Sequence, residues 1–151
     1  MTNSPKVLRD GLTRGLYMSH GTLEIRDFSK SKAFFREVLG IEAYRHSPQS
    51  MFIRKNAYMT VACVQTEEAS VDQGYENRWG VDVDSAEEVD RSYKRLLVER
   101  DRYGVQELLP PSRKDMGYSF ALRDLNGNWW EVQHADKDPA SLFDAATPSE
   151  H

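Results

Sequence analysis

The stretch SHGTLEIRDFSKSKAFFREVLG, residues 19–40, joins a strand pattern to a helix pattern and decides the fold. Leu23 and Ile25 alternate with polar residues, which is typical of a half-buried strand. The segment FSKSKAFFREVLG that follows predicts a helix with an apolar stripe, capped by Ser29 or Ser31 and ended by Gly40. His20 stands at the mouth of the strand, ahead of this helix.

The same order of elements occurs twice. Three further strand-like runs, IEAYRH, SMFIRK and YMTVACV, follow the first helix. The second half begins with the strand RWGVDVDS, and Ser85 with Glu88 has the capping-box spacing of a helix that stops at Gly104. VQELLPP, MGYSFALRD and NWWEVQH supply three more strands, and DLNGN predicts a hairpin turn.

We therefore predict an α+β fold of two β-α-β-β-β modules, whose curved mixed sheet surrounds a shared cavity. The modules are expected at residues 18–66 and 78–135, joined by a polar linker at 67–77. An N-terminal extension (1–17) and a C-terminal tail (136–151) flank them.

Composition limits the classes of function. The chain has 151 residues, a formal net charge of −4 and no basic block, so we expect no nucleic-acid partner. Its N-terminus lacks the apolar core of a secretion signal, and no apolar run is long enough to span a membrane. The single cysteine, Cys63, lies in an apolar run and is expected to be a buried, inert thiol. A cytoplasmic location is the expectation.

Strand alternation predicts which side chains face the cavity. Because Leu23 and Ile25 suit the helix side, His20, Thr22, Glu24 and Arg26 share the other side. In the second module the same argument turns Trp130 and Val132 toward the helix. The side chains that it turns inward are Arg78, Gly80, Asp82, Trp129, Glu131 and Gln133. Such a polar floor indicates a site, since buried charges are costly unless they are paired, hydrogen-bonded or metal-bound. A structural ion pair between Arg78 and Glu131 is the alternative reading.

The motifs at the two ends of this pattern resemble those of the vicinal oxygen chelate superfamily, which includes glyoxalase I, extradiol dioxygenases, fosfomycin-resistance proteins and bleomycin-binding proteins. HGTLEIRDFSKSKAFFREVLG is similar to the family's opening motif, and LRDLNGNWWEVQ to its closing motif. The resemblance covers about Met18 to His134 and implies one divalent metal ion (Fe, Mn, Ni or Zn) in the cavity. By position, His20 and Glu131 match metal ligands, and both are also the implied catalytic residues.

Arg78 departs from the family pattern, because it stands where a second histidine is often found. A guanidinium has no lone pair to offer a metal. Two alternatives stay open. In one, the metal binds His20, Glu131 and an unidentified third group. In the other, no metal binds, Arg78 holds a carboxylate, phosphate or phenolate, and His20 and Glu131 act as acid and base.

The resemblance implies an enzyme acting on a small aromatic or oxygen-rich molecule, as a metal-assisted dioxygenase, lyase or isomerase. A metal-free binding or resistance protein and a metal-free acid–base enzyme are the competing hypotheses. Expected substrate-binding residues are Arg78, Glu24, Tyr118, Trp129 and Gln133. A homodimer is expected, with the cavity built within one chain or across two.

Overall fold

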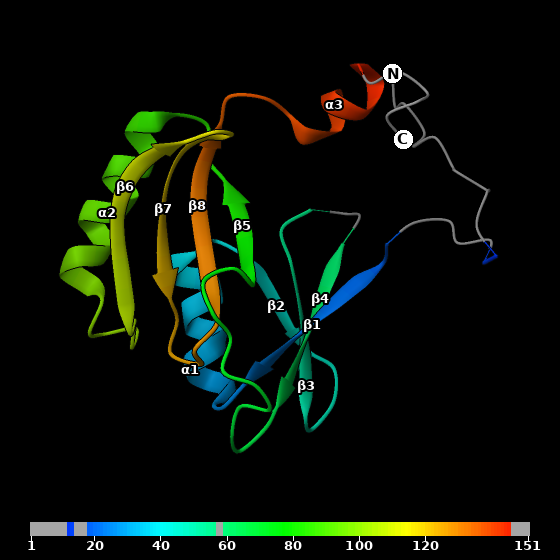
Figure 1. The fold of residues 1–151 in the computed structure, drawn as a ribbon. Coiled ribbons are helices and arrows are strands. Elements are labelled where there is room, and N and C mark those ends of the chain that lie inside the picture. Colours follow the sequence, from blue (N-terminus) through cyan, green and yellow to red (C-terminus); the bar gives the residue numbers. More distant parts are fainter. Residues whose placement is uncertain (1–11, 14–17, 57–58, 146–151) are drawn as a thin grey trace.

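Two four-stranded mixed sheets form the molecule (Figure 1). The computed structural model describes residues 12–13, 18–56 and 59–145. Most of the predicted N-terminal extension and the last six residues of the predicted tail therefore lie outside the described residues. In the described part, no helix is long and apolar enough to cross a membrane.

The first sheet has the strand order β1-β4-β3-β2. Its strands are β1 (His20–Ile25), β2 (Glu42–Arg45), β3 (Ser50–Arg54) and β4 (Thr60–Gln65). Strand β1 pairs with β4 in parallel, while β4, β3 and β2 pair antiparallel. Between β1 and β2 the chain forms helix α1 (Phe28–Ala33), which continues as the π-helical turn η1 (Phe34–Val38).

The second sheet repeats this topology in the order β5-β8-β7-β6. Its strands are β5 (Arg78–Asp82), β6 (Glu107–Lys114), β7 (Gly117–Arg123) and β8 (Trp129–Ala135). Helix α2 (Ala86–Glu99) follows β5, and a short helix α3 (Pro139–Ala145) follows β8. The predicted fold of two β-α-β-β-β units is confirmed.

The two modules share one hydrophobic core. Phe35 of η1 packs edge-on against Trp130 of β8, with ring centroids 5.8 Å apart. Helix α2 runs beside the second sheet, and α1 lies where the two sheets approach each other (Figure 1). The predicted helix-side residues Leu23, Ile25 and Trp130 are all buried in this core. We call the opposite side of each sheet, away from the helices, its open face.

Several local signals behave as the sequence predicts. The Ser85 side chain accepts a hydrogen bond from the backbone N–H of Glu88, which caps α2. Gly40 follows the first helix with a φ angle of 60°, a conformation that favours glycine. Gly104 has a φ angle of 67°, but it lies in the turns after α2, which ends at Glu99 and not at Gly104. Cys63 is fully buried, and burial raises the pKa of its thiol to about 12.

The cap predicted for the first helix is wrong. Asp27, not Ser29 or Ser31, is the N-cap of α1, and its carboxylate accepts from the N–H of Lys30. Ser31 lies fully buried inside the helix, where its hydroxyl is within hydrogen-bond distance of both side-chain amide atoms of Asn126. This contact comes from the DLNGN turn, 95 positions away in the sequence.

Candidate functional site

The candidate site lies on the open face of the second sheet, where Arg78 and Glu131 meet. Arg78 begins β5, and Glu131 lies on the parallel neighbour β8, opposite Gly80 and two positions further along. The Arg78 Nε–H donates a hydrogen bond to Oε2 of Glu131. This bond raises the pKa of Arg78, so the guanidinium stays charged. The ion pair between Arg78 and Glu131, the alternative reading of the sequence, is therefore observed.

A second cation converges on the same carboxylate oxygen. Nζ of Lys114, at the end of β6, lies 3.7 Å from Oε2 of Glu131. The Glu131 side chain is only 10% exposed, against 30% for Arg78 and 35% for Lys114. We call these three residues the cation cluster. The cluster carries two positive charges and one negative charge, and a second carboxylate, that of Glu76, lies 3.8 Å from Nη1 of Arg78 with its side chain 89% exposed.

One aromatic ring, that of Tyr75, contacts both cations of the cluster and packs against a second ring, that of Trp129. Tyr75, from the linker, packs edge-on against Trp129 at a centroid distance of 5.6 Å and an interplanar angle of 83°. The Arg78 guanidinium lies 4.5 Å from the Tyr75 ring centroid, within the range of a cation–π contact. Nζ of Lys114 donates a hydrogen bond to the Tyr75 hydroxyl. Trp129 is buried beneath this arrangement.

Hollows adjoin the cation cluster. One of about 250 Å³ is lined by Glu76, Arg78, Gly80, Glu131 and Gln133. Another of about 440 Å³ shares Glu76 and Arg78 with it and extends toward Thr22 and Asn128. The two hollows are in the size range of small-molecule pockets, or a little below it. Arg78 thus lines both of these hollows.

His20 is not part of this arrangement. It lies on the open side of β1 as predicted, but its ring nitrogen Nδ1 bonds the Ser19 hydroxyl at 2.8 Å and the residue is exposed. Among the described residues, no contact joins His20 to Arg78 or Glu131, and no three His, Cys, Asp or Glu side chains converge as metal ligands. The donor set around Glu131 is therefore a poor fit for a divalent cation, because two cationic side chains already hold its carboxylate.

The other predicted substrate-binding residues divide between the two faces. Gln133 lies on the open face, where its amide donates to Asp82 at 2.7 Å. Glu24 accepts two hydrogen bonds from Ser70 of the linker, at 2.6 and 3.0 Å, which lower its pKa. Tyr118 is on the helix side, where its hydroxyl donates to Asp90 of α2 at 2.6 Å. The prediction that Tyr118 lines the cavity is therefore wrong, because alternation along β7 turns its even-numbered side chains toward α2.

Sequence reasoning missed Lys114 and Tyr75. Lys114 ends a strand whose register shifts between Leu109 and Ser112, so alternation along β6 does not reveal its direction. Tyr75 belongs to the polar linker, which has no period at all. The only signal for it is an aromatic side chain standing alone in a polar segment, three positions before Arg78.

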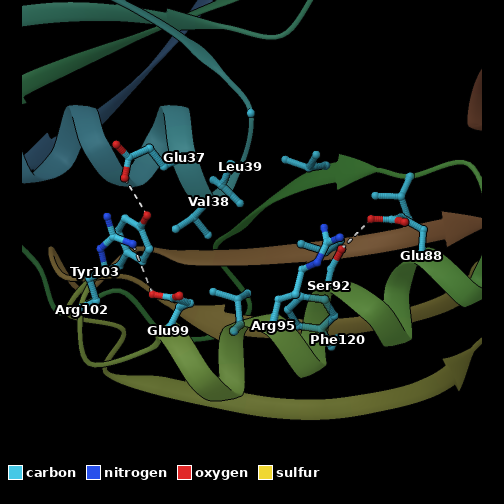
Figure 2. A pocket seen from close by; sticks show the side chains of 15 residues that line it. Glu37, Val38, Leu39, Glu88, Ser92, Arg95, Glu99, Arg102, Tyr103 and Phe120 are labelled. Carbon is cyan, nitrogen blue, oxygen red and sulfur yellow. Dashed lines mark hydrogen bonds and ion pairs between the residues drawn. The ribbon is translucent and has the colours of Figure 1, made fainter.

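A separate hollow of about 490 Å³ lies on the helix side, between η1 and α2 (Figure 2). Its floor is apolar, and acidic side chains around it already have partners. Glu37 accepts from the Tyr103 hydroxyl at 2.6 Å, Glu88 from the Ser92 hydroxyl at 3.2 Å, and Glu99 pairs with Arg102 at 3.6 Å (Figure 2). None of the predicted site residues lines this hollow.

Comparisons with known proteins agree with the fold. The family model described as Glyoxalase/Bleomycin resistance protein/Dioxygenase superfamily matches residues 18–132. The chain belongs to this superfamily of small-molecule enzymes and binding proteins, the group called vicinal oxygen chelate proteins above. No curated protein matches the sequence significantly.

Solved structures show the same fold at low identity. The fosfomycin resistance protein FosX from Listeria monocytogenes, complexed with Mn(II) and sulfate ion, is 21% identical with a TM-score of 0.64, covering 86% of this chain and 98% of that one. FosX from Mesorhizobium loti is 20% identical with a TM-score of 0.61, covering 84% and 97%. A glyoxalase-related enzyme from Fulvimarina pelagi is 21% identical with a TM-score of 0.63, covering 78% and 87%.

Proposed function

We propose that this chain binds a small organic anion on the open face of its second sheet without a metal ion. The single observation that carries the proposal is the convergence of Arg78 and Lys114 on one oxygen of Glu131. The second counter-charge beside these cations, Glu76, is 89% exposed and lies 3.8 Å from Arg78, so the oxyanion of a ligand would take its place. Charge-assisted hydrogen bonds from a guanidinium and an ammonium are among the stronger polar contacts in proteins.

The ligand's remaining atoms would lie in the hollows beside Arg78. Gln133 lines the smaller hollow with its amide, and Trp129, the register partner of Arg78, offers a ring surface next to it, so an aromatic or oxygen-rich molecule suits the site. Acid–base chemistry by His20 with Glu131, and the metal-assisted dioxygenase, lyase or isomerase reaction, stay predictions. So do the homodimer and the cytoplasmic location.

The test combines metal analysis with anion binding. We expect purified protein, incubated with Fe(II), Mn(II), Ni(II) or Zn(II) and then desalted, to retain far less than one metal ion per chain. Calorimetry with benzoate should detect binding that weakens about tenfold or more in Arg78→Gln and in Lys114→Met, because each removes one charge-assisted contact.

Arg54→Gln is the matched control. Arg54 lies on the open face of the first sheet and pairs with Glu42 at 2.6 Å. The Arg54→Gln variant therefore also removes one cation from an ion pair. Its benzoate affinity should equal that of the wild type. Near-stoichiometric metal that is lost in His20→Ala and Glu131→Gln would overturn the proposal in favour of the metal-assisted enzyme.

A further inference from the structure

Tyr75 contacts three of the groups that the proposed ligand would use, namely Lys114, Arg78 and Trp129. Its hydroxyl accepts from Nζ of Lys114, its ring faces the Arg78 guanidinium, and its edge meets Trp129. A phenol is a ring with one polar oxygen. The side chain of Tyr75 therefore makes the contacts on the open face that a small aromatic molecule with one oxygen substituent would make.

The linker that carries Tyr75 is fastened to the sheets by surface contacts. Ser70 donates to Glu24 of β1, and Asp72 pairs with Arg123 of β7 at 2.6 Å. The Asp72 side chain is 87% exposed, and exposed ion pairs add little stability. Apart from the contacts of Tyr75, the linker is therefore held weakly, and the main free-energy cost of its leaving the sheet is the loss of those contacts, which the ligand would replace.

We infer that Tyr75 occupies the position of the ligand's ring, and that the ligand is a monocyclic aromatic compound with an anionic oxygen, such as an aryl carboxylate or a phenolate. The inference rests on the proposed function and specifies its substrate class. Tyr75 acts as a resident competitor, which the ligand displaces when it binds to Arg78 and Lys114.

The presence of Tyr75 in the ligand's position has a measurable consequence for the affinity of the ligand. A ligand binds only the fraction of molecules in which Tyr75 has withdrawn, so its apparent dissociation constant is the intrinsic value divided by that fraction. Removal of the Tyr75 ring frees the slot in all molecules. Aromatic anions should then gain affinity more than non-aromatic anions of the same charge, which lack the ring that fills the space against Trp129.

The test compares 4-hydroxybenzoate with cyclohexanecarboxylate by calorimetry on wild-type and Tyr75→Ala protein. We expect Tyr75→Ala to bind 4-hydroxybenzoate about tenfold more tightly than the wild type. The gain for cyclohexanecarboxylate should be clearly smaller. Tyr44→Ala is the matched control, because Tyr44 is a tyrosine on the open face of the first sheet and is 71% exposed. It should leave both affinities unchanged.

Thermal melting checks that the variants fold, and Tyr75→Leu replaces Tyr75→Ala where the smaller side chain prevents folding. Anion binding that depends on Arg78 but is the same in wild type and in the Tyr75 variant would overturn this inference and leave the proposed function standing. A complete lack of anion binding in the wild type and both tyrosine variants would overturn the two together. An equal gain for both anions would overturn the aromatic specificity.

Discussion

The Glu131 carboxylate lies between two cationic side chains, and this pairing decides what the open face can bind. Its position on β8 and that of Arg78 on β5 follow from strand alternation, because side chains two apart share a face. The third member, Lys114, reaches the same oxygen from the far edge of the sheet. Strand alternation could not predict this contact of Lys114, because the register of β6 shifts before the strand ends.

Gly21 shows how closely the two modules approach at the level of one residue. A Cβ atom at Gly21 of β1 would overlap the indole ring of Trp79 from β5, whereas a Cβ at Gly80 would meet nothing within 4 Å. Neither glycine has the positive φ that would itself exclude alanine. The difference between the two positions is therefore one of space alone.

We expect Gly21→Ala to lower the free energy of unfolding by about 1–3 kcal/mol, because the Trp79 ring must shift within a packed core. Gly80→Ala, the matched control, should change it by less than about 0.5 kcal/mol. Urea denaturation of both variants measures the difference. Equal stabilities would show that β1 and β5 do not pack together as described.

At the scale of elements, the β7–β8 turn fastens the second module to the first. Asp124 is fully buried and accepts hydrogen bonds from the backbone of Asn126 and Asn128 and from the indole N–H of Trp130, at 2.8–3.0 Å. The Asn128 amide in turn donates to the Glu24 carbonyl at 2.9 Å. The turn was predictable from its Asn-Gly pair, but its contacts with β1 and α1 were not. These contacts join residues about a hundred positions apart, which local sequence patterns cannot predict.

Asp124 should make stability depend on pH. Burial raises the pKa of its carboxyl from 3.8 to about 6. The folded protein therefore binds this proton more tightly than the unfolded chain, and the stabilisation is complete below about pH 3.8 and lost as pH rises through about 6.

Urea denaturation of wild type and Asp124→Asn at pH 5 and pH 8 tests this prediction. The variant loses an acceptor and should be less stable at both values. The deficit should be larger at pH 5 than at pH 8, by about 1 kcal/mol, because only the wild type gains from protonation. Parallel pH dependences in the two proteins would rule out Asp124 as the titrating group.

At the scale of the whole molecule, one core spans both modules while the open faces stay free of it. The sequence predicts this architecture well, because the repeat of strand, helix and three strands survives in both halves. Its prediction for the site was less complete. His20 and Glu131 lie on open faces as alternation requires, yet the residues that meet Glu131 are Arg78 and Lys114. The way the two modules pack decides which open-face residues meet, and neither motif encodes it.

The central claim is that Arg78 and Lys114 serve a ligand anion in place of a metal ion, with Glu131 as their internal counter-charge. The most direct test is benzoate binding to Glu131→Gln in the presence of EDTA. The substitution removes the carboxylate that competes for both cations, so we predict that benzoate binds several-fold more tightly than to wild type, although the protein becomes less stable. Loss of benzoate binding in Glu131→Gln, or binding in the wild type only after Mn(II) is added, would contradict the account.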